Sequence, residues 1–182
     1  ECSEEEVYKI EMLMNQAGIT VHDRPVVDIA LSRAEETEAP AAALELADGR
    51  MITGKTTDLL GPCAALLLNA LKELAGIPHS QPVISPAAIE PIQTLKTQYL
   101  GSKNPRLHMD EVLIALSVSA ASDPNAQKAL EQLPNLKGCQ AHTSVMVSDV
   151  DRKLFMKLSI QATFEAKYEN NSVIFPKKGI YP

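Results

Sequence analysis

The stretch AAALELADGRMITGKTTDLLGPCAALLLNALKELAGI (residues 41–77) decides the fold of this chain. Residues 42–46 and 50–53 are short strand-like runs, and the Asp-Gly pair between them is typical of a hairpin turn. The apolar residues that follow recur with helical spacing, which predicts a buried helix from Pro62 to about Leu74. A hairpin followed by a buried helix favours an α/β domain.

The sequence after this stretch alternates further strands with helices. We expect strands at residues 82–85, 141–147 and 160–166, and helices at residues 86–100, 110–121, 124–133 and 149–158. Pro91 lacks an N–H group, so it should kink the first of these helices or shift its start. The predicted fold is a mixed sheet of about five strands, the hairpin plus parallel strands, covered by helices on both faces.

Three segments make up the predicted domain organisation. Residues 1–40 form a small helical appendage of two helices, residues 41–167 form the α/β domain, and residues 168–182 form a tail. The tail contains an apolar run, so we expect it to pack on the body or on a partner. Because the chain starts at Glu1, inside a helical pattern, we expect it to be the C-terminal piece of a longer protein.

The overall charge and the cysteines restrict the class of protein. The formal net charge of −6 disfavours nucleic acid and anionic membranes as partners, because both are bound by clustered Lys and Arg. No apolar run approaches the length that crosses a bilayer, and no signal peptide is recognisable. The three cysteines form no CxxC motif, so we expect reduced thiols in a cytoplasmic protein without a cofactor.

Residues Gly49 to Thr56 match G-x-x-x-x-G-K-T, the pattern of a phosphate-binding loop. In such a loop a helix starts at the Lys and Thr, so that its amides face the phosphates. Here Gly61-Pro62 would break that helix, and residues 50–53 have the pattern of a strand. We interpret the match as a hairpin followed by a turn, with a phosphate site as the alternative.

The cysteines and histidines give weak indications of a catalytic or metal site. Cys63 lies at a predicted helix start, where the helix dipole lowers a thiol pKa, but a small buried cysteine is the preferred interpretation. Cys139 and His142 have a spacing seen among metal ligands, yet positions i and i+3 of a strand point to opposite faces. We therefore predict no metal site.

The polar segment from Gly101 to Asp110 is the stronger candidate for a binding site. It brings hydrogen-bond donors and cations next to a predicted helix start, which is a favourable place for an anion. Acidic residues at the same helix start, which complement the helix dipole, are the structural alternative. The candidate ligand-binding residues are Lys55, Thr56, Thr57, Ser102, Lys103, Asn104, Arg106 and His108, which we expect to line one cleft.

Several long runs resemble the C-terminal region of the bacterial family called domain of unknown function 1846. They include EEEVYKIEMLMNQAGI, DGRMITGKTTDLLGP, ISPAAIEPIQTLK, YLGSKNPRLHMDEVLIALS and ALEQLPNLKGCQAH, and together they cover nearly the whole chain. The resemblance implies a separate α/β domain ahead of this region. It implies no particular activity, because the family has none established.

The order of elements also resembles the cytidine-deaminase-like fold. In that fold a zinc ligand and a catalytic Glu open one helix, and P-C-x-x-C opens the next. The matching positions here are taken as Cys63-Ala64-Ala65 and Pro86 to Glu90, which lack the Glu and both later thiolates. The resemblance therefore implies the fold without zinc-dependent deaminase chemistry.

Three functional hypotheses follow. The leading hypothesis is an accessory domain that contributes to a ligand cleft and to subunit contacts; its partners would be a preceding α/β domain, further copies of the chain and a small anionic ligand. The second is part of a nucleotide- or phosphometabolite-binding enzyme, with Lys55, Thr56, Arg106 and His108 contacting anionic groups. The third is a purely structural oligomerisation domain.

Overall fold

A four-stranded mixed sheet forms the centre of the molecule. The computed structural model describes residues 4–167, and the predicted tail lies outside them. Strands β1 (Ala41–Glu45), β2 (Met51–Lys55), β3 (Gln140–Thr143) and β4 (Gln161–Phe164) lie in the order β2-β1-β3-β4. Strand β1 is antiparallel to both neighbours, and β3 and β4 are parallel. The α/β class and the hairpin are confirmed.

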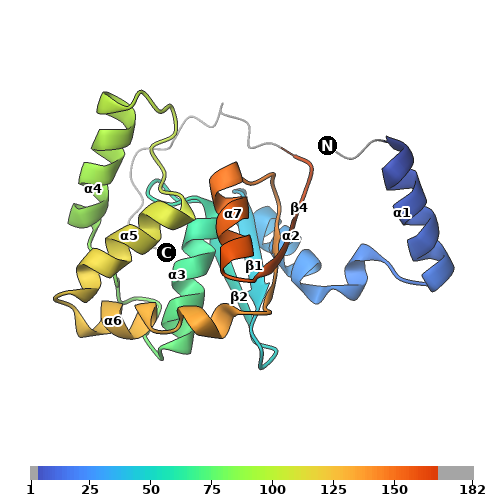
Figure 1. The fold of residues 1–182 in the computed structure, drawn as a ribbon, viewed down its shortest axis with the longest axis horizontal. Coiled ribbons are helices and arrows are strands. Elements are labelled where there is room, and N and C mark those ends of the chain that lie inside the picture. Colours follow the sequence, from blue (N-terminus) through green and yellow to red (C-terminus); the bar gives the residue numbers. More distant parts are fainter. Residues whose placement is uncertain (1–3, 168–182) are drawn as a thin grey trace.

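One face of the sheet carries most of the helices (Figure 1). Helix α3 (Pro62–Leu74) packs on β1 and β2 and contributes the centre of the main core. Helices α5 (Met109–Ala120) and α6 (Pro124–Leu130) pack on α3, and α7 (Asp149–Lys157) packs on α5 and β4. The remaining elements on this side are α4 (Pro86–Thr94), the π-turn η2 (Leu95–Tyr99) and the 3₁₀ turn η3 (Leu133–Leu136).

The close approach of α3 to the sheet depends on Gly54. A Cβ atom at this position would lie 2.1 Å from the backbone nitrogen of Leu66, far inside contact distance. Opposite Gly54 on β1 is Ala42, which is also fully buried. Two small residues side by side therefore let the backbones of helix and strand meet.

The opposite face of the sheet is covered by α2 (Pro25–Thr37). Val26, Val27 and Ala30 form a second small core with Ala43 of β1. Arg24, at the start of α2, donates hydrogen bonds to side chains of β3 and β4, and so fixes the helix across the sheet. Helix α2 is thus a layer of the α/β body, whereas the division of the chain at residues 40 and 167 stays a prediction.

Helix α1 (Glu4–Ala17) and the short 3₁₀ turn η1 (Val21–Asp23) precede this body. Figure 1 shows α1 apart from the sheet and its helices. Its apolar residues Val7, Ile10 and Leu13 are exposed. The predicted stop at Gly18 is confirmed, since this glycine has a φ of 66° and the helix ends at Ala17.

The predicted strand at residues 82–85 is wrong, and the predicted count of about five strands is reduced to four among residues 4–167. Pro82 and Ser85 flank the buried Val83 and Ile84 in an irregular segment that joins no sheet. The apolar run reflects burial of Val83 and Ile84 against α3 rather than strand pairing, because both side chains belong to the main core. Helix α4 continues through Pro91 before it widens into η2.

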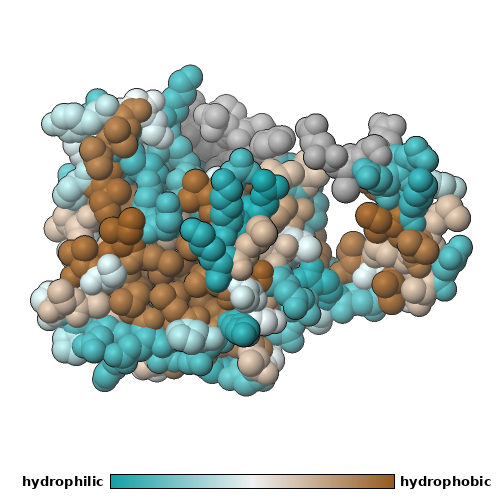
Figure 2. Space-filling model, in the orientation of Figure 1, coloured by the Kyte–Doolittle hydropathy of each residue, from teal (hydrophilic) through white to brown (hydrophobic). Residues whose placement is uncertain are grey.

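Apolar side chains also gather on part of the surface. Figure 2 shows brown areas on the side of the molecule where α4, α5 and α6 lie. The exposed large apolar residues in η2, directly after it and in α5 are Leu95, Tyr99, Leu100, Ile114 and Val118. Apolar residues that gather in this way differ from the singly scattered apolar residues that are normal on the surface of a globular domain. Within residues 4–167 no helix has both the length and the hydropathy needed to span a bilayer.

The contact at Gly54 gives a direct test of the fold. Gly54→Ala should lower the free energy of unfolding by about 3 kcal/mol, because the new methyl group overlaps the α3 backbone. Gly61→Ala is the matched control, since the nearest atom to its added Cβ is 3.7 Å away; it should change stability by less than about 1 kcal/mol. Urea unfolding followed by circular dichroism measures both, and equal stabilities would contradict the packing argument.

Candidate functional site

The first turns of three helices meet at one pocket, here called the helix-start pocket. It is lined by Pro62 and Cys63 of α3, His108 before α5, Ser148 and Asp151 at the start of α7, and Arg106 of the preceding loop. Its volume is about 150 Å³. Helix starts carry unpaired N–H groups and partial positive charge, so their convergence favours a negatively charged group at this place.

Asp151 supplies that negative charge from within the protein. It is 7% exposed, and its Oδ1 accepts a hydrogen bond of 2.8 Å from the backbone N–H of Met109, the first residue of α5. Its Oδ2 accepts from the Ser148 hydroxyl at 2.9 Å. A single carboxylate thus joins the starts of α5 and α7.

His108 is the titratable partner of this carboxylate. Its Nδ1 lies 3.1 Å from Asp151 Oδ2, and this hydrogen bond raises the pKa of His108 above the ordinary value, against the opposing effect of burial. Since Asp151 accepts at Nδ1, the proton of the neutral ring belongs on Nδ1. The Nε2 nitrogen then carries the lone pair, on a side chain that is 30% exposed and lines the pocket.

Ser148 and Cys63 complete the polar lining without the geometry of an activated nucleophile. The Ser148 hydroxyl donates to Asp151 and accepts from the Asp151 backbone N–H, so it caps α7. Burial, with a smaller effect of Asp151, raises the pKa of the Cys63 thiol well above its ordinary value. Cys63 is therefore a neutral buried thiol, in agreement with the preferred interpretation of the sequence.

Lys96 holds the polar loop at residues 101–108 against the start of α5. This lysine is 7% exposed; its Nζ donates to the Arg106 carbonyl and pairs with Glu111 at 2.7 Å. The Asn104 side chain accepts from the Arg106 backbone N–H and shapes the turn. The loop therefore presents Asn104 and Arg106 to the pocket from an ordered backbone.

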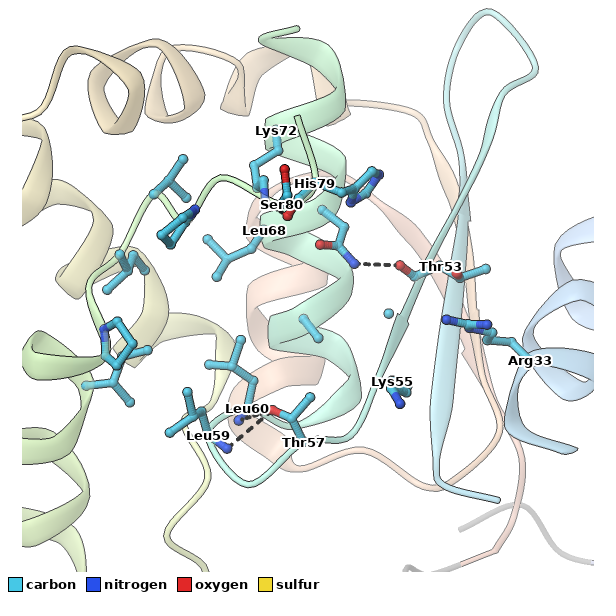
Figure 3. Close-up of a pocket in the computed structure, with 18 residues that line it drawn as sticks. Arg33, Thr53, Lys55, Thr57, Leu59, Leu60, Leu68, Lys72, His79 and Ser80 are labelled. Carbon is cyan, nitrogen blue, oxygen red and sulfur yellow. Dashed lines mark hydrogen bonds between the residues drawn. The ribbon is translucent and has the colours of Figure 1, made fainter. Parts of the chain in front are cut away.

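The predicted ligand-binding residues separate into two groups. Asn104, Arg106 and His108 line the helix-start pocket, whereas Ser102 and Lys103 line neither this pocket nor the second cavity described below. Lys55 and Thr57 line that second cavity, which lies along α3 and β2 (Figure 3). Thr56 is buried next to them, with its backbone N–H bonded to the Pro40 carbonyl. Five of the eight residues thus line two different cavities rather than one, and the role of all eight in ligand binding stays a prediction.

The phosphate-binding-loop motif takes a different form from that of a nucleotide site. Gly49 lies in the hairpin turn, residues 51–55 form β2, and the next helix begins only at Pro62. No helix start therefore faces Lys55 and Thr56, as a phosphate cradle would require. Gly54 serves the packing of α3 instead.

Asp151 and Ser148 were missed by the sequence analysis. The pattern Ser148-x-x-Asp151 ahead of an apolar run signals a capped helix start, which is the one local clue to their position. Nothing local indicates that the Asp151 carboxylate reaches α5, because that contact spans 42 positions of the chain.

The donors at the helix-start pocket do not fit a zinc ion. Cys63 is the one thiol that lines the pocket among residues 4–167, and both oxygens of Asp151 already accept hydrogen bonds. Across residues 4–167 no three side chains of His, Cys, Asp or Glu are grouped to hold a metal.

Comparison with known proteins finds a family and bacterial relatives that this chain resembles over most of its length. Residues 22–174 match the family described as "Domain of unknown function DUF1846, C-terminal". The chain is 55% identical over 165 residues to a UPF0371 protein of Corynebacterium glutamicum and 48% identical over 167 residues to one of Streptococcus pneumoniae. These matches cover 91% and 92% of this chain but 33% and 34% of the relatives, so the chain spans about a third of their length.

The His108–Asp151 pair should be visible in a titration. Asp151→Asn should lower the pKa of His108, because the neutral amide no longer favours the imidazolium. Asp149→Asn, at an exposed residue that pairs with Arg152, is the control and should leave the His108 titration unchanged. Proton NMR of the imidazole resonances measures both; an unchanged His108 pKa in Asp151→Asn would contradict the pairing.

The same pair makes stability depend on pH. The folded-state pKa of His108 lies above that of the unfolded chain, so the pair stabilises the fold fully below about pH 6.5. This contribution is lost as the pH rises through the folded-state value. The difference in unfolding free energy between the original chain and Asp151→Asn should accordingly be larger at pH 5.5 than at pH 8.5.

Proposed function

Because the chain belongs to the family of domain of unknown function 1846, and spans a third of its relatives, we propose that it is a domain that supplies one wall of a ligand cleft in a longer protein. The helix-start pocket is the part of the domain that forms this wall. The His108–Asp151 pair within it, at 3.1 Å, is the observation that carries the proposal.

His108 acts in this cleft as a general acid or base. An imidazole whose Nδ1 is held by a carboxylate presents Nε2 in a fixed direction, which is the arrangement by which proteins transfer protons. Asp151 positions the ring and balances its charge, and Met109 and Ser148 hold Asp151 in turn. The proposed activity is proton transfer on a bound substrate, without a metal supplied by this domain.

The substrate of this cleft carries an anionic group. Asn104 and Arg106 lie on the same pocket as His108, whose pKa is raised by Asp151. An arginine next to an imidazole that is readily protonated favours a phosphate or carboxylate. A phosphorylated metabolite is the proposed ligand class.

The rest of the protein supplies the other wall. The exposed apolar residues over α4 and α5 offer a surface for the preceding domain, and two thirds of the relatives' length lies outside this chain. Assembly into a homo-oligomer also remains a prediction. The free buried thiols of Cys63 and Cys139 favour a reducing compartment, so the cytoplasm is the proposed location.

A relation to the cytidine-deaminase-like fold is part of the proposal. With no strand at residues 82–85, the strand beside β1 is β3 and the helix that follows it is α7. The counterparts of the second zinc motif would then be Ser148 and Asp151, in place of Ala87 and Glu90. The pocket would be the former metal position, now held together by the histidine–carboxylate pair.

A binding experiment on the full-length protein tests the anion site. Arg106→Gln should weaken binding of pyrophosphate, used as the probe, at least about tenfold through loss of a charge-assisted hydrogen bond. Lys103→Gln is the matched control, because Lys103 lies on the same loop but does not line the pocket; its affinity should stay within about twofold. Isothermal titration calorimetry gives the dissociation constant of pyrophosphate for each variant. An equal loss of affinity in the two variants would contradict a specific site and indicate a general effect of charge.

A further inference from the structure

The second cavity, here called the edge cavity, lies between α3, the outer edge of β2 and the irregular segment at residues 79–85 (Figure 3). Its volume is about 170 Å³. Apolar walls are provided by Leu59, Leu60, Leu68, Val83, Ile84 and Ile89. Concave sites with mostly apolar walls and a few polar groups are typical of small-molecule binding.

The charges of the edge cavity are all of one sign. Arg33, Lys55 and Lys72 line it, and among the described residues no Asp or Glu does. The chain as a whole has a formal net charge of −6, so this cationic lining runs against the overall balance. Arg33 also pairs with Glu36 at 3.4 Å outside the cavity. The lining thus selects against cations and favours an anionic group in an otherwise apolar space.

Lys72 is the most unusual of these residues. It is only 6% exposed, and its Nζ donates a hydrogen bond of 2.6 Å to the carbonyl oxygen of His79. No carboxylate of residues 4–167 forms an ion pair with it, in contrast to the equally buried Lys96, which pairs with Glu111. Burial lowers the pKa of Lys72, which reflects the cost of an ammonium group without a counter-ion.

The two buried lysines therefore differ in whether a carboxylate balances their charge. Lys96 has its anion within the protein and fastens a loop. Lys72 retains two further N–H donors beside a cavity and has one carbonyl as its partner. An anionic ligand in the edge cavity would compensate the charge of Lys72, as Glu111 does for Lys96.

We propose that the edge cavity binds a small carboxylic acid with an apolar body, whose carboxylate pairs with Lys72 while its hydrocarbon part packs on Leu68, Val83 and Ile84. Lys55, at the end of β2, adds positive charge at the cavity wall. The buried ammonium of Lys72 already donates to one carbonyl and stands next to apolar walls, which suits a carboxylate that carries a hydrocarbon body. The Thr53 carbonyl of the edge strand already accepts a hydrogen bond from the Asn69 side chain. The proposed binding of the acid therefore does not involve this backbone group.

Calorimetry on the full-length protein tests this with octanoate and the neutral 1-octanol as matched probes. The protein should bind octanoate at least about tenfold more tightly than 1-octanol, because only the acid pairs with Lys72. Lys72→Met should remove this preference and leave 1-octanol affinity within about twofold, since methionine preserves the apolar packing. Lys153→Met, at an exposed residue of α7, should change neither affinity.

Each outcome decides the proposal. Equal affinity for octanoate and 1-octanol, or an octanoate affinity unchanged by Lys72→Met, overturns it. Lys72→Met should melt at or above the temperature of the original protein, because it removes a buried charge. If this variant does not fold, Lys72→Gln takes its place, and the comparison of the two probes on the unsubstituted protein decides the proposal by itself.

Discussion

The contact between the backbone of β2 and the backbone of α3 at Gly54 is the constraint on which the rest of the structure depends. It sets the depth at which α3 lies on the sheet, and α5 and α6 are packed on α3 in turn. The alanines of β1 serve the same purpose on both sides, with Ala42 beneath α3 and Ala43 beneath α2. Small side chains on β1, together with the backbone contact between α3 and β2, give this small sheet a densely packed core.

The helix-start pocket exists because three helices point their positive ends at one place. Such an arrangement is unfavourable by itself, since like partial charges approach each other and N–H groups remain unpaired. Asp151 resolves the conflict, because its carboxylate accepts hydrogen bonds from the Met109 N–H at the start of α5 and from the Ser148 hydroxyl that caps α7. The stability of the arrangement and the pKa of His108 therefore have a common origin.

Local patterns in the sequence predicted the parts of the fold that depend on neighbours in the chain. The hairpin at Asp48-Gly49, the helix start at Pro62 and the end of α1 at Gly18 are confirmed, because turn and cap chemistry is local. The segment at residues 82–85 was misjudged, since an apolar run does not distinguish a paired strand from a buried irregular segment.

The candidate sites were predictable only in part, for the same reason. Asn104, Arg106 and His108 share one loop, so their proximity followed from the sequence, and the structure places them on one pocket. Their separation from Lys55 and Thr57 depends on the position of α3 between the two cavities, which no local pattern contains. Asp151 and Lys72 owe their importance to burial and to distant partners.

Helix α5 connects the helix-start pocket with exposed apolar side chains. Its first turn is preceded by His108 and bonded to Asp151, while Ile114 and Val118 stand exposed further along the same helix. Both places therefore belong to one rigid element, a helix of twelve residues. In the proposed assembly, a ligand in the pocket and a domain on the apolar side chains would both contact α5, so each would raise the affinity for the other if they favoured the same position of this helix.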